Sequence, residues 1–219
     1  MVKKRILVFS GTYIPGYKGG GPIRSLENIF NQLSEDVDFY LVTSNRDVGD
    51  KKPYKGINTN TWTAVGKVSV FYINESYLKK SVFNEILEKV KPDTIYLNSL
   101  FSFYSIYILW ILSISRFNRI RLLLAPRGEL SPGALKEKKI KKFFFILITK
   151  HLRIYKNLQW QASSEYEFFD IKKQYDKHRR IYIASNLVNY TKLKSHNVIN
   201  LNKNKGEIRI IFLSRITKK

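Results

Sequence analysis

The chain has 219 residues, of which 44% are hydrophobic and 14% aromatic, and this composition allows a packed core and excludes wholesale disorder. It contains no cysteine, which excludes disulfides and thiolate metal sites, and its three histidines are scattered, so no metal is expected. Its 39 Lys+Arg against 17 Asp+Glu leave a formal net charge of +22, which predicts an anionic partner unless the charge is only a compositional bias.

In the first half of the chain, short apolar runs predict strands and helically spaced apolar residues predict helices. Strands are expected at residues 4–9, 39–43, 68–73 and 94–97. Helices are expected from Pro22 onward, after a loop rich in Gly and Pro, and from Val82 to Val90, before Pro92. The apolar run Ile6 to Phe9 is too short for an export signal, which favours a cytoplasmic protein.

The second half continues this alternation. Strands are expected at residues 121–125, 158–162 and 180–184, and helices at 101–117, 135–154 and 164–175. Residues 94–115 carry no charge, a length that would allow a membrane span, but polar residues interrupt them and they divide into a strand and a helix. The alternation predicts an α/β fold: a Rossmann-like, mostly parallel sheet with helices on both faces and ligands beyond the carboxyl ends of the strands.

The last part of the chain has a different composition. Residues 190–206 are polar and rich in Asn and Lys, which is typical of an interdomain linker. Residues 207–219 contain another apolar strand, ending in Ser214-Arg215. The expected organisation is therefore a domain at 1–189, a linker at 190–206 and the first strand of a second, truncated domain at 207–219.

Three consecutive glycines, Gly19, Gly20 and Gly21, follow the first predicted strand and precede Pro22. Glycine lets a phosphate approach the backbone, and a helix N-terminus offers free N–H groups and the positive end of the helix dipole. The spacing matches neither the P-loop nor the dinucleotide-binding Gly-x-Gly-x-x-Gly motif. The segment is a candidate phosphate-binding loop, and a flexible surface loop is the alternative.

Arg127 and Glu129 follow the strand expected at 121–125. A guanidinium just beyond a strand end is suited to clamp a phosphate or a carboxylate. The alternative is that both residues pair with other surface charges. Further on, Ser163 or Ser164 is expected to cap the following helix, with an acid in its first turn.

Residues 136–156 carry eight Lys and Arg and one acid, with Phe143 to Phe145 in their midst. A basic helix with bulky aromatic side chains can lie on an anionic membrane surface. The alternative, of equal weight, is that Phe144, Leu147, Ile148 and Leu152 form a core stripe and the lysines a solvated face.

Six short segments stand in order along the chain: the Gly19-Gly20 loop, Pro-Asp-Thr-Ile-Tyr-Leu-Asn-Ser at 92–99, Ala-Pro-Arg-Gly-Glu-Leu at 125–130, Ser-Ser-Glu-Tyr-Glu at 163–167, Ile-Ala-Ser-Asn-Leu-Val-Asn at 183–189 and Phe-Leu-Ser-Arg at 212–215. Together they resemble the family 4 (group 1) glycosyltransferases, which have the two-domain GT-B fold. Asn98 and Arg127 stand where many members carry His, and Ser185-Asn186-Leu187 replaces the usual Pro-Asn-Gly.

The resemblance implies retaining, metal-independent transfer of a sugar from a nucleotide-sugar donor to a glycan or lipid-linked acceptor in bacterial surface polysaccharide biosynthesis. It implies that Asn98 and Arg127 line the cleft near the reacting sugar, and that the donor phosphates contact Gly19, Gly20, Gly21 and Arg215. A Lys usual in the family would fall just past Lys219, so the fragment alone is expected to be inactive. The nucleotide-sugar is a substrate, and no cofactor is expected.

The same resemblance implies that the N-terminal domain binds the acceptor. The acceptor or an anionic membrane surface would contact a set of basic residues: Arg24, Lys138, Lys139, Lys141 and Lys142. The protein would then be peripheral at the inner face of the bacterial membrane. The alternatives are a nucleic-acid-binding domain, which no zinc finger, RNA-binding motif or helix-turn-helix supports, and a membrane-surface scaffold without catalysis.

Overall fold

The computed structural model describes residues 3–113, 120–152, 154–155, 158–175 and 180–189, together with residues 206, 208 and 210. The chain divides into two units, Met1–Val188 and Asn189–Lys219, and the described secondary structure belongs to the first. Arg215 lies outside the described residues, as does the strand expected at 207–219 apart from residues 208 and 210.

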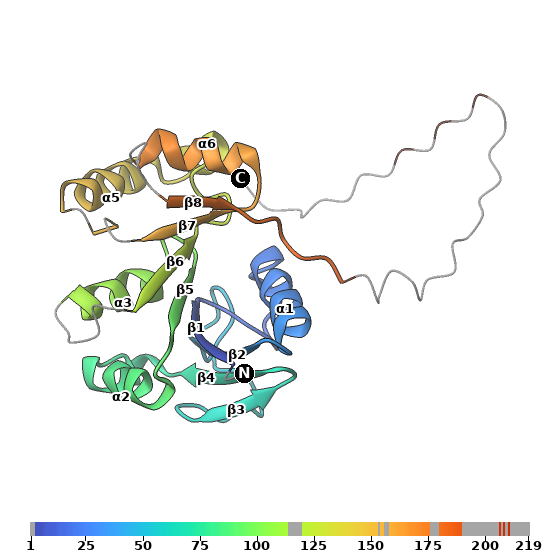
Figure 1. Cartoon of the computed structure of the whole chain (residues 1–219), viewed down its shortest axis with the longest axis vertical. Helices are drawn as coiled ribbons and strands as arrows, with labels where there is room; N and C mark the ends of the chain where they lie inside the picture. Colours follow the sequence, from blue (N-terminus) through green and yellow to red (C-terminus); the bar gives the residue numbers. More distant parts are fainter. Residues whose placement is uncertain are drawn as a thin grey trace. The chain divides into compact units, whose positions relative to one another are not determined.

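The first unit is built on a sheet of eight described strands (Figure 1). In chain order they are β1 (Lys4–Ser10), β2 (Val37–Ser44), β3 (Trp62–Val65), β4 (Val68–Ile73), β5 (Thr94–Asn98), β6 (Arg121–Ala125), β7 (Gln159–Ala162) and β8 (Arg180–Ile183). Their order across the sheet is β3-β4-β2-β1-β5-β6-β7-β8, and neighbours are parallel except β3 and β4. The predicted α/β fold with a Rossmann-like, mostly parallel sheet is therefore confirmed.

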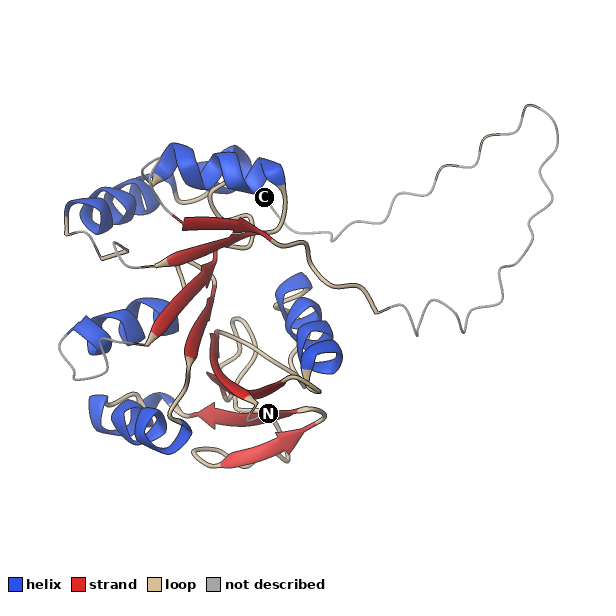
Figure 2. Ribbon diagram, viewed as in Figure 1, coloured by secondary structure: helices blue, strands red, loops and turns tan. Residues whose placement is uncertain are grey.

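Helices connect the parallel strands (Figure 2). They are α1 (Gly21–Leu33), α2 (Lys80–Val90), α3 (Phe103–Ser113), α4 (Pro132–Lys136), α5 (Lys139–His151) and α6 (Glu165–Gln174), with a short 3-10 turn, η1 (Glu75–Tyr77). Pro22 lies in the first turn of α1, where its missing N–H would have no intrahelical partner. Within the described residues, no helix is both long enough and apolar enough to cross a bilayer.

Two apolar cores lie on the two faces of the sheet. Val8 of β1 belongs to one core and Phe9 to the other, because successive side chains of a strand point to opposite faces. Helix α1 packs into the core of Val8 through Leu26 and Phe30. Helices α2, α3, α5 and α6 contribute to the core of Phe9. Figure 1 shows α1 across the sheet from α2 and α3, so helices cover both faces, as predicted.

One predicted element needs correction, and one observed strand has no predicted counterpart. The single helix expected at 135–154 is wrong, because α4 ends at Lys136 and α5 begins at Lys139. Lys138 between them has a left-handed backbone, with φ of 51°, which a continuous right-handed helix excludes. The edge strand β3 is absent from the predicted elements because its residues are half-exposed and form no apolar run.

The segment after β8 returns to α1. Three side chains of α1 donate hydrogen bonds to it: Ser25 Oγ to Asn186 Oδ1 (3.0 Å), Asn28 Nδ2 to the Leu187 carbonyl (2.7 Å) and Gln32 Nε2 to the Val188 carbonyl (2.9 Å). We call residues 186–188 the strap. The strap joins the outermost strand of one half of the sheet to the helix that covers the other half.

Candidate functional site

A recess opens at the carboxyl edge of the sheet, where the strand order reverses. The chain runs from β1 to β2 on one side and returns to β5 on the other, and sheets of this kind bind ligands at such a switch point. The recess has a volume of about 450 Å³. Strand ends, the β1–α1 loop and the start of α3 line it, with polar side chains that include Ser10, Arg46, Asp47, Asn98, Ser99, Ser102 and Glu129.

A buried carboxylate holds the loop between β1 and α1. Asp47 Oδ2 accepts hydrogen bonds from the N–H groups of Tyr17 (2.8 Å) and Lys18 (3.0 Å), and its Oδ1 accepts one from the N–H of Val48 (2.8 Å). Burial alone would raise the pKa of Asp47, but these hydrogen bonds outweigh it and hold the pKa below its usual value. The loop is thus anchored by an ionised carboxylate at neutral pH.

The three predicted glycines have different surroundings. A Cβ on Gly19 would lie 2.4 Å from Thr12 Oγ1, so the loop closes tightly there. Gly20 has φ of 65° and ψ of −128°, a backbone conformation that glycine adopts at little cost. Gly21 begins α1, and a Cβ there would meet no atom within 4 Å. Gly20 provides no side-chain cap, Pro22 has no N–H and the N–H of Ile23 donates to the Gly20 carbonyl (3.2 Å), so the start of α1 offers an anion the N–H of Gly21 and the positive end of the helix dipole.

The two adjacent glycines give a matched pair of substitutions. Gly20→Ala is expected to lower the free energy of unfolding by about 1–3 kcal/mol, because a side chain strains this backbone. Gly21→Ala is expected to be neutral or to stabilise by up to about 1 kcal/mol, because alanine favours a helix. Urea denaturation measures both. Equal effects of the two substitutions would contradict the distinct backbone roles.

Asn98 and Arg127, predicted from separate motifs, are in direct contact. Arg127 Nε donates to Asn98 Oδ1 (2.6 Å) and its Nη2 donates to Tyr96 Oη (2.7 Å). Its Nη1 donates to Asn186 Oδ1 in the strap. Tyr96 Oη in turn donates to Gln161 Oε1 (2.7 Å). Among the described residues Arg127 makes no ion pair, so the alternative in which it pairs with a surface carboxylate is wrong.

A second buried carboxylate fixes the turn that carries Arg127. Arg127 and Gly128 both have left-handed backbones, with φ of 58° and 78°. Glu167 Oε1 accepts from the N–H of Gly128 (2.6 Å), and its Oε2 accepts from the N–H (2.7 Å) and Oγ (2.6 Å) of Ser163. Ser164 Oγ caps α6 through the N–H of Glu167 (3.3 Å), as the sequence predicts. Glu167 is therefore a positioning residue for the Arg127 turn.

Glu129 lies in the wall of the recess and holds the β5–α3 connection. Its Oε1 accepts from Ser99 Oγ (2.7 Å), and its Oε2 accepts from the N–H groups of Leu100 (2.6 Å) and Phe101 (3.3 Å). Ser99 has φ of 108°, a strained conformation of the kind that gathers at functional sites. Burial raises the pKa of Glu129 above its usual value, against the hydrogen bonds and the positive charge of Lys142, which lower it.

Glu129→Gln is expected to change how stability depends on pH. The folded-state pKa of Glu129 exceeds its ordinary value of 4.5, so its contribution to stability falls as the pH rises from that value through the folded-state pKa. The free energy of unfolding of the wild type minus that of Glu129→Gln should therefore decline as the pH rises above about 4. Urea denaturation at a series of pH values measures it, and a flat or rising difference would contradict the assignment.

The structure brings together some of the predicted site residues. Gly19 and Asn98 line the recess, Arg127 contacts Asn98, and Gly20 and Gly21 form the start of α1 beside it. Arg215 lies outside the described residues.

The predicted basic surface is divided between two places. Arg24 lies on α1, is exposed and pairs with Glu27 (2.8 Å). Lys138, Lys139, Lys141 and Lys142 lie on or beside α5, which packs on the other face of the sheet. Lys142 Nζ donates to the Ala134 carbonyl (2.6 Å) and lies 5.2 Å from the centroid of the Phe101 ring, while the other three lysines are exposed. Arg24 therefore does not share a surface with the lysines.

Several residues of the site have no predicted role, among them Arg46, Tyr96 and Gln161. Arg46 follows β2, whose carboxyl end lies beside that of β1, and including this strand end among the ligand-bearing edges would have found it. Tyr96 lies two residues before Asn98 on the same strand, and that spacing places both side chains on one face. Gln161 gives no signal in the sequence.

No protein-family model matches the chain, and no curated protein matches it. Among solved structures, the chain is similar to dTDP-glucose 4,6-dehydratase from Bacillus anthracis str. Ames in complex with NAD, at a TM-score of 0.39 and 11% sequence identity. The match covers 72% of this chain and 54% of that chain, so this protein spans about half the length of the enzyme. Among the described residues, no group of three or more His, Asp or Glu side chains could hold a metal ion.

Proposed function

We propose that the chain is the acceptor-binding part of a nucleotide-sugar-dependent glycosyltransferase, which extends a glycan or lipid-linked acceptor in bacterial surface polysaccharide biosynthesis. The observation that carries the proposal is the recess at the switch point. One wall is a glycine loop and an uncapped helix start, which suit phosphate, and the other is a set of hydrogen-bonding side chains, which suit sugar hydroxyls.

The polar wall supports a carbohydrate ligand. A sugar hydroxyl both donates and accepts hydrogen bonds, so it matches the amide of Asn98 and the hydroxyls of Ser99 and Ser102, all of which line the recess. Phe103, 53% exposed at the start of α3, adds an aromatic surface to the same lining. The recess volume of about 450 Å³ lies within the range of small-molecule sites.

The charged groups support transfer from a nucleotide diphosphate. Departure of the sugar leaves negative charge on the diphosphate, and fixed donors stabilise such charge without rearrangement. The donors at this edge of the sheet are the N–H of Gly21, Arg46, which also pairs with Glu75 (3.4 Å), and the fork of Arg127. The proposed reaction retains the anomeric configuration of the sugar and uses no metal ion.

Sugar transfer by the native gene product tests the proposal. The protein is incubated with a panel of nucleotide sugars carrying a labelled sugar and with lipid-linked glycans extracted from bacterial membranes, and label in the lipid and glycan fractions is measured. We expect transfer with at least one donor, and a loss of about 10²-fold in Asn98→Ala, because the amide contacts the reacting sugar. Asn31→Ala, exposed on α1, is the matched control.

Three outcomes would overturn the proposal. The first is absence of transfer with every donor. The second is tight binding and turnover of a nicotinamide dinucleotide in the recess, which would assign redox chemistry instead. The third is tight, salt-sensitive binding of duplex nucleic acid without any dependence on nucleotide sugar, which would favour a nucleic-acid-binding domain.

A further inference from the structure

Helix α5 is apolar on two sides. Its inner side packs into the domain through Ile146 and the hydroxyl of Thr149, which are both buried. Its outer face is exposed and carries five large apolar side chains, Ile140 (73%), Phe143 (61%), Phe144 (54%), Leu147 (51%) and Ile148 (52%), with His151 as a polar residue at the carboxyl end of the same arc. We call these five residues the outer face of α5. The alternative in which Phe144, Leu147, Ile148 and Leu152 form a core stripe is therefore wrong, because each of these residues is more than half exposed.

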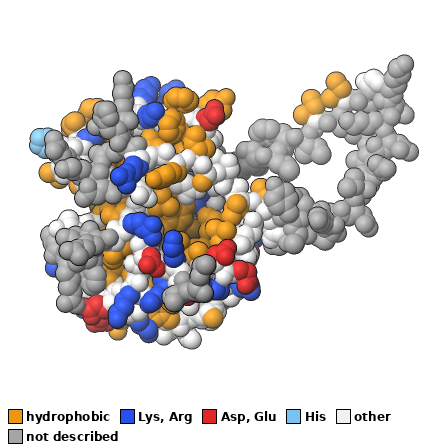
Figure 3. Space-filling model, viewed as in Figure 1, with side chains coloured by type: hydrophobic (Ala, Val, Ile, Leu, Met, Phe, Trp, Pro, Cys, Tyr) orange, Lys and Arg blue, Asp and Glu red, His pale blue; other side chains and the backbone are white. Residues whose placement is uncertain are grey.

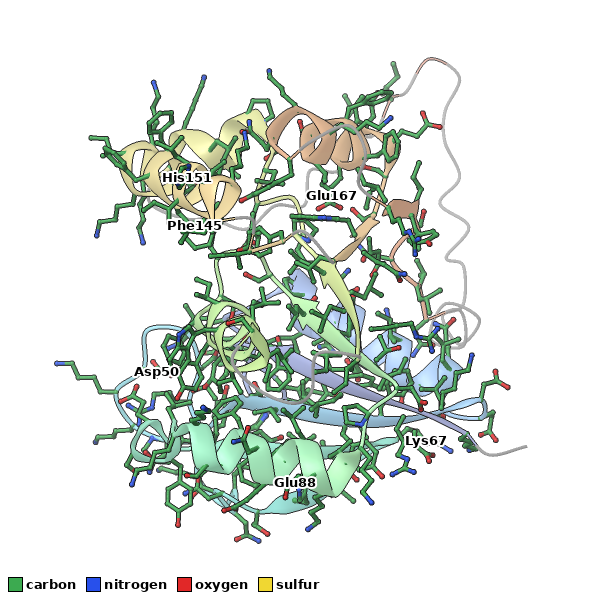
Figure 4. The ribbon with its side chains drawn as sticks, turned by 60° about the vertical axis from the view of Figure 1, so that its left-hand side comes forward. Asp50, Lys67, Glu88, Phe145, His151 and Glu167 are labelled. Carbon is green, nitrogen blue, oxygen red and sulfur yellow. The ribbon has the colours of Figure 1, made fainter. Side chains whose placement is uncertain are left out.

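Lysines border the outer face on both margins. At about 100° per residue, the outer face covers an arc of about 140°, from Phe143 to Ile148. Lys139 and Lys150 lie within about 40° of Phe143, and Lys141 lies within about 20° of Ile148. Figure 4, which labels Phe145 and His151, shows side chains of α5 reaching away from the domain, and Figure 3 shows apolar surface interspersed with Lys and Arg.

An apolar groove adjoins the same face. It has a volume of about 400 Å³ between α4 and α5, and its apolar lining includes Leu135, Phe143 and Leu147. Lys136, Lys139 and Lys150 belong to the same lining. The groove thus offers apolar walls next to positive charges, a combination that suits the acyl chain and the phosphate of one anionic lipid.

We propose that α5 lies flat on an anionic phospholipid bilayer, with its outer face among the upper acyl chains and its bordering lysines on the lipid phosphates. A bilayer presents negative charge above an apolar interior, and the lysine–apolar–lysine profile of α5 is complementary to that order. Long lysine side chains can reach the phosphates while their helix sits lower. This inference goes beyond the proposed function and does not depend on it.

Vesicle flotation of the full chain tests the proposal. Vesicles of phosphatidylcholine alone are compared with vesicles that contain a third phosphatidylglycerol. We expect binding to the anionic vesicles only. The pair Lys139→Gln and Lys141→Gln should weaken binding about 25-fold, because one lysine near such a surface is worth about fivefold. The pair Ile140→Asn and Phe144→Asn should weaken it by more than about tenfold, because exposed apolar side chains lose their burial in lipid.

Matched control variants test whether vesicle binding depends on α5 or on exposed lysines and apolar side chains elsewhere in the domain. Lys51→Gln with Lys52→Gln removes two exposed lysines of the β2–β3 loop, and Tyr166→Asn with Phe169→Asn removes two exposed aromatic residues of α6. Both control pairs should bind as the wild type does. A tryptophan in place of Phe144 should shift its emission to the blue on anionic vesicles, and one in place of Phe169 should not.

The occupant of the outer face is decided by the same set of variants. Equal binding to neutral vesicles, or binding that neither α5 pair weakens, would overturn the proposal. A dimer of the wild type would also overturn it, if light scattering shows that the Ile140/Phe144 double variant is a monomer and if the wild type binds no vesicles. The outer face would then join two copies of the chain. A third outcome is that the wild type binds RNA or DNA but no vesicles, and that the Lys139/Lys141 double variant loses this binding. That result would assign the lysines to nucleic acid instead.

Discussion

Glu167→Ala is expected to lower the free energy of unfolding by about 3 kcal/mol, because it leaves the N–H of Gly128 and both donors of Ser163 without their charged partner. For a unit of this size the melting temperature should fall by roughly 6–12 °C. Glu165→Ala removes an exposed acid from the same helical turn and should change the free energy by no more than about 0.5 kcal/mol.

Calorimetry of the two variants measures the difference. The reason to expect a large value is the burial of Glu167, which is 6% exposed, because a donor left unpaired in such a place is not fully hydrated. The same change should loosen the turn of Arg127. Similar melting temperatures for the two variants would show that water replaces the carboxylate, and would remove Glu167 from its positioning role.

Arg127→Ala is expected to lower kcat/KM for sugar transfer by about 10²–10³-fold if the proposed function holds, because it removes a preorganised cationic fork from the site. Arg127→Lys should recover little, since an ammonium cannot reach Asn98, Tyr96 and Asn186 at once. The transfer assay on both variants, with donor concentration varied, separates kcat from KM.

The control for Arg127 lies on the same strand. Arg121 is exposed at the amino end of β6, away from the carboxyl edge, and Arg121→Ala should leave transfer unchanged. Loss of the Arg127 side chain also removes one hydrogen-bond partner of Tyr96, which is 5% exposed, so stability is measured beside activity. If Arg127→Ala were fully active at unchanged stability, the guanidinium would have no part in either the site or the fold.

The sequence predicts the sheet well because most of its strands are short apolar runs, and the strands at its centre, such as β1, β4 and β5, are largely buried. β4 and β6 match their predicted bounds at residues 68–73 and 121–125, since continuous apolar runs are typical of parallel strands. The contact between Asn98 and Arg127 follows from the same logic, because β5 and β6 are neighbours and both residues stand at the carboxyl edge. The strap could not be predicted, because two of its three hydrogen bonds from α1 go to backbone carbonyls, which leave no residue pattern.

Helix α5 shows where periodicity fails. Apolar residues that recur at helical spacing indicate which side of a helix is apolar, but they cannot indicate whether that side faces the core. The sequence has apolar residues around most of α5, so two faces compete for burial, and the domain buries the one that carries Ile146 and Thr149. The break before it depends on the left-handed backbone of Lys138, which no Gly or Pro marks.

The strap has a consequence for the order in which the unit assembles. Its hydrogen bonds to α1 join residues 156 to 161 positions apart in the chain. Contacts so distant in sequence are closed late, because the entropy of a large loop must be overcome first. On the ribosome α1 would emerge long before residues 186–188 exist. The contact between α1 and the segment after β8 therefore makes closure of the unit a late step in its folding.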